Sequence, residues 1–221
     1  GRTGTHRSQT KWSVYRRALQ CNQMIKKLTV TGVIGACVCI YECSTPVVTK
    51  HVAGDSVACV DHSSLILWGT AWRSNQKEPE RRRSIARQAI TNFFTTNFAI
   101  APDSILEQIQ GRDPVALSDT EILNFAQTST HKWRQIVLIR VEELGPLIVI
   151  YPSPILWEGG TETRMRIRVL DIAPPALKTD VSLHRRDTGA FVLRGTGSLN
   201  HDLEFTLKEV FGEKCESRQI R

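Results

Sequence analysis

The chain has 221 residues, of which 41% are hydrophobic and 23% charged, so it can bury a core and lacks the composition of a disordered protein. Its formal net charge of +7 would suit a nucleic-acid-binding protein, but residues 1–50 carry eight of the 29 basic side chains and one of the 22 acidic ones. Residues 51–221 therefore hold 21 of each sign. A neutral domain lacks the clustered positive field that phosphate backbones require, so we expect no nucleic-acid partner.

Two segments at the start of the chain read as processing sequence. Residues 1–23 contain no methionine and show no sustained periodicity, so we interpret them as an upstream or added leader. Residues 24–37, MIKKLTVTGVIGAC, place two lysines before a short uncharged run. That run is shorter than the roughly 20 residues of a membrane-spanning helix, so it predicts an export signal over residues 24–36.

The end of this signal resembles the lipobox of bacterial lipoproteins, because small residues precede Cys37 in Ile-Gly-Ala-Cys. The resemblance implies that the signal is cleaved and that Cys37 carries the lipid. Cys43 is the alternative, since it is followed by Ser-Thr-Pro. An ordinary secretory signal and a buried strand are the two other interpretations of the segment. Residues 37–56 are then expected to form a flexible tether.

Residues 57–213 predict one globular domain, with a tail over 214–221. The apolar run 65–68 predicts a strand within 57–71, and Pro79 suits the first turn of the helix that follows. The helix has an apolar face made of Ile85, Ala86, Ala89, Ile90 and Phe93. Its three arginines, 81–83, are expected to be solvated. A short strand is expected within 100–109.

The second half of the domain contains a second helix, three strands and a third helix. Ser118 and Glu121 match a capping box, which predicts a helix over 118–130. Strands are expected at 135–144, which is apolar throughout, at 161–172, which alternates, and at 177–186 beyond two turn-forming prolines. The last helix is expected over 198–211, ended by Gly212. This order predicts an α/β (α+β) domain with three helices and a mixed five- to six-stranded sheet.

Motifs of catalysis and metal binding do not occur. The sequence has no nucleophile elbow, P-loop, zinc-protease or dinucleotide fingerprint, and its cysteines lack zinc-ligand spacing. The histidines of the domain are well separated: His62, His131, His184 and His201. We therefore expect no metal, no cofactor and no catalytic residue. Cys59 and Cys215 could pair in an oxidising compartment, but their positions in the sequence do not show proximity.

Two glycine clusters support an alternative function. They contain Gly159 and Gly160 before a predicted strand, and Gly195, Gly197 and Ser198 before the last helix. Free N–H groups in such loops can hold an anion, as in a hydrolase or a small-anion-binding enzyme. This alternative predicts His184 or His201 beside a carboxylate in a concave pocket. The other interpretation of these clusters is a turn and a helix cap.

The segment 144–157 is apolar and interrupted by three prolines. It is either a buried loop or edge strand, or an exposed surface that faces a partner. In the second interpretation the partner surface comprises Leu147, Ile148, Ile150, Tyr151, Ile155 and Trp157.

Three segments, VLIRVEELGP (137–146), LWEGGTETRMRIRVLD (156–171) and FVLRGTGSLNHDLEFTLKEVFG (191–212), resemble small bacterial envelope lipoproteins. Over about residues 56–213 the domain is similar to that of the curli-secretion lipoprotein family and of the TolB N-terminal domain. The resemblance implies a lipid-anchored, non-catalytic binding or assembly module of the outer membrane that faces the periplasm and contacts other envelope proteins. The curli family inserts long membrane-spanning hairpins, whereas residues 145–160 are expected to lack such paired strands.

Overall fold

The computed structural model describes residues 46–54, 60–73, 77–150, 157–190 and 196–215. These residues belong to one compact unit of the chain, Ser44–Arg221. The expected leader, the export signal and the cysteines at positions 37, 43 and 59 lie outside the described residues. The predicted lipidation and the predicted pairing of Cys59 with Cys215 therefore stay predictions.

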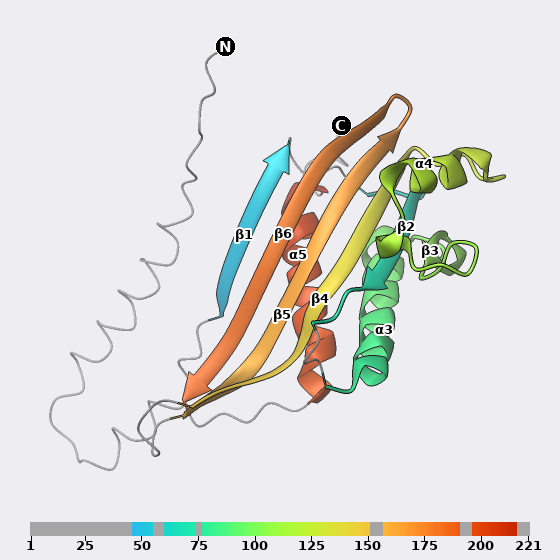
Figure 1. Cartoon of the computed structure of the whole chain (residues 1–221). Helices are drawn as coiled ribbons and strands as arrows, with labels where there is room; N and C mark the ends of the chain where they lie inside the picture. Colours follow the sequence, from blue (N-terminus) through green and yellow to red (C-terminus); the bar gives the residue numbers. More distant parts are fainter. Residues whose placement is uncertain (1–45, 55–59, 74–76, 151–156, 191–195, 216–221) are drawn as a thin grey trace, which may run out of the picture. The chain divides into compact units, whose positions relative to one another are not determined.

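A six-stranded mixed sheet in the order β1-β6-β5-β4-β2-β3 forms the centre of the domain (Figure 1). Strand β2 runs parallel to β3 and β4, and the other neighbouring pairs are antiparallel. The strands are β1 (Val47–Gly54), β2 (Ser64–Thr70), β3 (Ile105–Leu106), β4 (Gln135–Ile150), β5 (Trp157–Ile172) and β6 (Pro175–Ala190). The predicted fold class is confirmed, although the strand expected within 100–109 is only two residues long.

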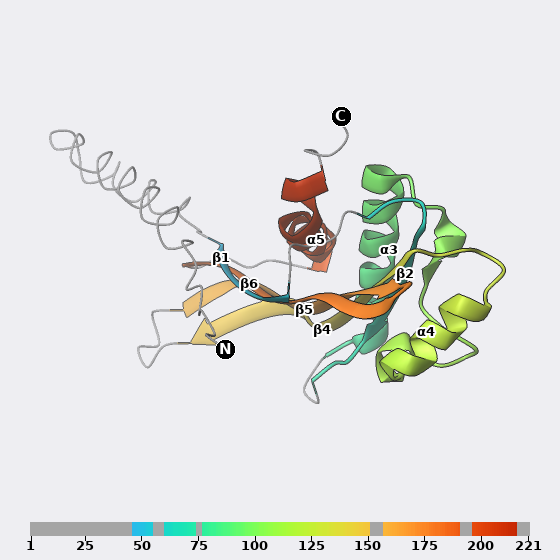
Figure 2. The same cartoon turned by 90° about the horizontal axis from the view of Figure 1, so that it is seen from above.

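Two helices cover one face of the sheet and a third lies on the other face (Figure 2). Helices α3 (Pro79–Phe98) and α5 (Leu199–Cys215) pack on the first face through the apolar stripes that the sequence predicts. They bury Ala86, Ala89, Ile90, Phe93, Leu199, Leu203, Leu207, Val210 and Phe211. Helix α5 continues past Gly212 to Cys215, so the expectation that this glycine ends the helix is wrong.

Helix α4 (Asp119–Thr128) begins with the predicted capping box. The Ser118 hydroxyl accepts from the backbone N–H of Glu121, and the Glu121 carboxylate accepts from the backbone N–H of Ser118 at 2.8 Å. The helix buries Ile122 and Ala126 against the β2 and β4 end of the sheet. The same face of β5 and β6 carries mostly polar side chains.

Strand β5 shows the predicted alternation. Met165, Ile167 and Val169 are buried beneath α3 and α5, and the arginines between them lie on the opposite face. Arg166 pairs there with Asp180 of β6, through an Nε to carboxylate distance of 2.8 Å.

The tether expected over 37–56 differs from the structure in its second half. Val47–Gly54 form strand β1, which pairs antiparallel with β6 from Val47 opposite Arg186 to Gly54 opposite Thr179. Three valines and a threonine favour a strand, and β6 offers a pairing edge that local sequence does not reveal. The domain therefore begins about ten residues before the expected start at residue 57.

The segment 144–157, for which a buried loop, an edge strand and a partner-facing surface were left open, contributes to the extension of a hairpin. Residues 145–150 of β4 pair with residues 157–162 of β5. Pro146 fits in this strand because β2 pairs with β4 only as far as Val141, so one side of β4 is an edge from that point onward. This paired stretch covers six residues of each strand, so it is shorter than the membrane-spanning strands of roughly ten residues that the segment was expected to lack.

Candidate functional site

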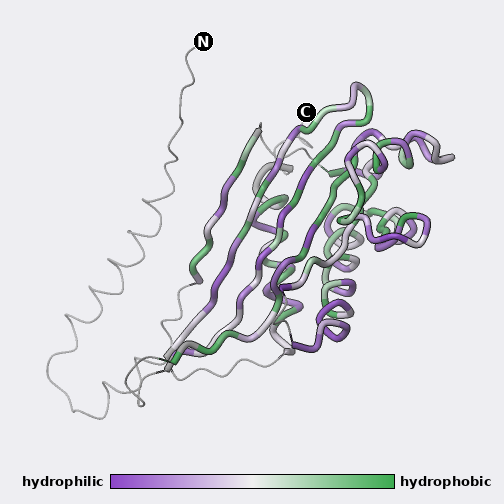
Figure 3. Tube along the Cα trace, viewed as in Figure 1, coloured by the Kyte–Doolittle hydropathy of each residue, from purple (hydrophilic) through white to green (hydrophobic). Residues whose placement is uncertain are grey.

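The described chain contains an extended hairpin end, defined as residues 145–150 of β4 with residues 157–162 of β5. Strands β4, β5 and β6 project here beyond the helical layer (Figures 1 and 2). The β4 part carries a hydrophobic stretch (Figure 3). Ile148 is 57% exposed and Ile150 is 75% exposed. Among the described residues, the other large apolar side chains that are more than half exposed are Val47, at 60%, and Leu177, at 54%.

The alternation of β4 explains why Ile148 is exposed. Leu144 is fully buried against the core beneath α3 and α5, and Ile148 follows it on the same face of the strand. Across the sheet Ile148 lies opposite Gly159, and Gly159 lies opposite Gly189. Neither glycine has a side chain that could cover the isoleucine. The row of apolar residues on the buried face of β4 thus continues beyond Leu144, which is the last of them that α3 and α5 cover.

The structure distributes the six residues of the predicted partner surface as follows. Ile148 and Ile150 are exposed, and Leu147 is half-buried on the opposite face of β4. Trp157 begins β5 opposite Ile150. Tyr151 and Ile155 lie outside the described residues. The structure thereby brings Ile148 and Ile150 to one exposed face, while their contact with a partner stays a prediction.

The glycines of the predicted anion loop have different roles. Gly159 and Gly160 are buried within β5 and do not form a loop. A Cβ at Gly160 would lie 1.9 Å from the Asp187 carbonyl oxygen, so glycine permits the close approach of β5 and β6. Gly197 and Ser198 belong to a short 3-10 helix, Thr196–Ser198, that precedes α5. Gly195 lies outside the described residues, and the expected loop at 159–160 is instead a strand.

His184 does meet a carboxylate, as the enzymatic alternative requires. Its Nε2 lies within hydrogen-bond distance of Glu162, and Arg186 approaches the same carboxylate at 3.4 Å. Burial raises the pKa of Glu162, but the His184 hydrogen bond and the charge of Arg186 outweigh burial and lower that pKa overall. A carboxylate with a lowered pKa accepts protons poorly near neutral pH. The pair therefore forms a hydrogen-bonded contact between β5 and β6. His201 lies exposed on α5 and contacts no carboxylate among the described residues.

A buried charged cluster lies between the sheet and α5. The Arg185 guanidinium is 3.9 Å from Asp202 and 4.0 Å above the ring of Phe205, and Thr161 donates to Asp202 at 2.7 Å. Arg185 is 6% exposed and Asp202 is 2% exposed. The sequence does contain a signal for this cluster, because Arg185 continues the inward-facing positions of Val181 and Leu183 in β6.

No group of three or more histidine, cysteine, aspartate or glutamate side chains among the described residues is arranged to hold a metal ion. None of the helices in the described ranges has the length and hydropathy needed to span a membrane.

Comparisons with known proteins give only a distant structural likeness. No family model matches the sequence, and no curated protein matches it. The solved PelC dodecamer from Paraburkholderia phytofirmans is similar with a TM-score of 0.38 and 13% identity, covering 74% of this chain and 94% of that chain. A variant PelC dodecamer from the same organism gives a TM-score of 0.39 and 14% identity, covering 75% and 98%. At these low values no property of PelC is transferred to this chain.

Proposed function

We propose that the protein is a lipid-anchored, non-catalytic module of the bacterial cell envelope that binds or assembles other envelope proteins through its hairpin end. The observation that carries this proposal is the exposure of Ile148 and Ile150, 57% and 75%, on a strand whose inner part is fully buried. Exposed apolar side chains that gather at one place mark interaction sites in soluble domains.

Contact with a protein partner would stabilise this end in two ways. Removing a large aliphatic side chain from water contributes about 1.5–3 kcal/mol when the burial is complete. In addition, β4 pairs with β2 only as far as Val141, so the outer edge of residues 145–150 is open to a partner strand in the described sheet. A partner with an extended apolar segment could therefore add to the edge and cover Ile148 at the same time.

The lipid anchor completes the proposal. Acylation at Cys37, or at Cys43 as the alternative, would hold the domain at the outer membrane on its periplasmic side. Ten peptide links separate Cys37 from Val47, the first residue of β1, and they span at most about 35 Å when fully extended. A short tether of this kind keeps the domain close to the membrane and so favours partners located in the envelope.

The test of the binding surface is site-specific photo-crosslinking in cells. A photoreactive residue replaces Ile148 in one version of the chain and Leu177 in the other. Leu177 is the matched control because it is 54% exposed and lies at the opposite end of β6. We expect a discrete adduct with an envelope protein from position 148 alone. Equal adducts from both positions, or none from either, would overturn the proposed surface.

The test of the anchor is separate. We expect labelled palmitate to enter the chain and to be lost from either the Cys37→Ser or the Cys43→Ser variant, which also identifies the acylated cysteine. Complete absence of label in the unaltered chain would refute the anchor and leave the proposed binding surface standing.

A further inference from the structure

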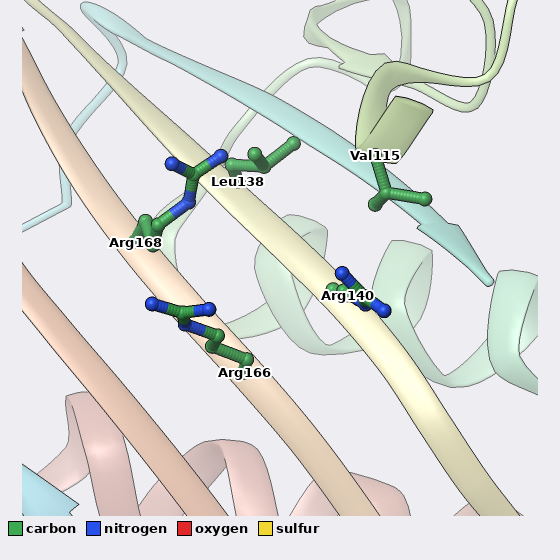
Figure 4. Close-up of a pocket in the computed structure, with 5 residues that line it drawn as sticks. All are labelled: Val115, Leu138, Arg140, Arg166 and Arg168. Atoms are coloured by element: carbon green, nitrogen blue, oxygen red, sulfur yellow. The ribbon is translucent and has the colours of Figure 1, made fainter. Parts of the chain in front are cut away.

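A cavity of about 210 Å³ opens on the sheet face that carries α4. Three of its five lining side chains are arginines, Arg140 from β4 and Arg166 and Arg168 from β5 (Figure 4). Leu138 and Val115 supply the apolar part of the wall. The cavity is well away from the hairpin end, since Arg140 lies opposite Arg166 near the middle of the β4 and β5 ladder.

The strand register places these positive charges against one another. Arg140 is paired directly with Arg166, and Arg168 is the next residue on the same face of β5. Like charges directly opposite in an antiparallel pair destabilise a sheet. Considered as a cross-strand pair alone, Arg140 opposite Arg166 therefore destabilises the sheet. Local rules of this kind are typically broken where a protein binds something.

Each of the three guanidinium groups contacts a carboxylate that does not line the cavity. Arg166 bonds Asp180 on β6 at 2.8 Å, Arg168 lies 2.7 Å from Asp119 on α4, and Arg140 lies 3.3 Å from Glu142. Each carboxylate belongs to a different element, so each arginine is oriented independently. These contacts fix the direction of side chains that are otherwise flexible, and a fixed guanidinium loses less entropy when it binds an anion.

Donors remain for a ligand after these contacts. An arginine carries five N–H groups, and Asp180 engages the Nε and Nη2 atoms of Arg166. Among the described residues the hydrogen bonds of Arg166 therefore leave the N–H groups of Nη1 for a further acceptor. Arg140 is 44% exposed along its side chain and meets Glu142 through Nε, so its two terminal nitrogens can also turn toward the cavity.

We propose that this cavity binds the phosphoryl group of an anionic ligand. A phosphoryl group presents at least three acceptor oxygens, which suits three arginines better than the two oxygens of a carboxylate. Leu138 and Val115 would contact the apolar part of the ligand that carries the phosphate. The site is independent of the hairpin end and of the lipid anchor. A soluble phosphate ester and the headgroup of a phospholipid share this chemistry.

The first experiment titrates inorganic phosphate into the full chain at low ionic strength by calorimetry. We expect saturable binding that weakens as sodium chloride is added, because salt screens partly exposed charges. The Arg140→Gln variant should bind phosphate about tenfold more weakly, as expected for one lost charge-assisted hydrogen bond. Arg134→Gln is the matched control, because Arg134 also lies near β4 but is 64% exposed and does not line the cavity.

A second measurement keeps the test decisive if Arg140→Gln does not fold. Phosphate titrated into the unaltered chain should shift the arginine Nε–H NMR signals of Arg140, Arg166 and Arg168 and leave that of Arg134 in place. No binding by the unaltered chain, equal affinity in the two variants, or shifts spread over all arginines would overturn the proposal.

Vesicles distinguish the two sources of the phosphoryl group. Cosedimentation of the non-acylated chain with phosphatidylglycerol vesicles, lost in Arg140→Gln and retained in Arg134→Gln, would assign the site to a lipid headgroup. Phosphate binding without such cosedimentation would assign it to a soluble phosphate ester. Either result supports the proposed site.

Discussion

The Arg82 guanidinium on α3 donates to the carbonyl oxygen of Leu144 on β4 at 2.8 Å. Arg82 is 7% exposed, so this one of the three consecutive arginines is buried, contrary to the expected solvated run. The hydrogen bond joins the first turn of α3 to β4 at Leu144, the last fully buried apolar side chain among the described residues of that strand. Gly145, the next residue of β4, makes room for it, because a Cβ there would lie 2.1 Å from Arg82 Nη1.

We therefore predict that Gly145→Ala destabilises the domain. The added methyl group would displace the buried guanidinium and break its hydrogen bond, which should lower the free energy of unfolding by about 1–3 kcal/mol. Urea denaturation measures this change. The matched control is Gly197→Ala, since a Cβ at exposed Gly197 has no heavy atom within 4 Å. Equal midpoints for both variants would contradict the prediction.

A second prediction concerns the aromatic cluster between α3 and α5. Phe94 is fully buried, and its ring centroid lies 5.1 Å from that of Phe93 and 5.4 Å from that of Phe211. Phe94→Ala should lower the free energy of unfolding by about 3–5 kcal/mol, because it opens a cavity in the core. Thermal unfolding monitors the loss. Thr96→Ala, at an exposed position of the same helix, should leave the melting temperature nearly unchanged.

The buried charge of Asp202 leads to a third prediction. Asp202→Asn would remove one of the two buried carboxylates beside the Arg185 guanidinium and leave only Asp187, at 3.8 Å, near it. We expect a loss of about 3 kcal/mol of unfolding free energy, as is typical when one member of a buried ion pair is removed. Chemical denaturation provides the measurement, with His201→Gln on the exposed side of α5 as the control. Unchanged stability of Asp202→Asn would show that the ion pair contributes nothing.

The fourth prediction is a pH dependence at the start of α4. Hydrogen bonds from the backbone N–H and the hydroxyl of Ser118, aided by Arg112, lower the pKa of Glu121 from 4.5 to about 2. Because the folded-state pKa is the lower one, the stabilisation is complete above pH 4.5 and is lost as the pH falls toward about 2.

Urea midpoints at about pH 6 and about pH 3 provide the measurement for Glu121. Glu121→Gln should reduce the difference between the two midpoints, because glutamine does not titrate. Glu158→Gln, outside any helix start, is the comparison for a carboxylate without a capping role. A difference as large in Glu121→Gln as in the unaltered chain would contradict the role of the capping box.

The candidate surface was only partly predictable from sequence. The apolar residues of 144–157 indicated a partner-facing patch, and the structure exposes Ile148 and Ile150 on one face of a hairpin. The sequence did not decide between a loop and an edge strand for this segment, because Pro146 argues against a central strand and the sequence does not show where β2 ends. The prediction of a tether in place of β1 was wrong because the pairing edge on β6 is likewise invisible in the local sequence. A short β-branched segment becomes a strand only when an edge such as that of β6 is available to it.

The sequence by itself determined the helices, the inner strands and the faces that they bury. Helical periodicity, the capping box at Ser118 and the alternation around Met165 depend on interactions within a few residues, so local pattern is sufficient to predict them. Only the tertiary structure decided that β1 joins the sheet, that Arg82 is buried, and that Arg140 lies opposite Arg166. These features depend on strand order and register, which join residues far apart in the chain through contacts that no local pattern records.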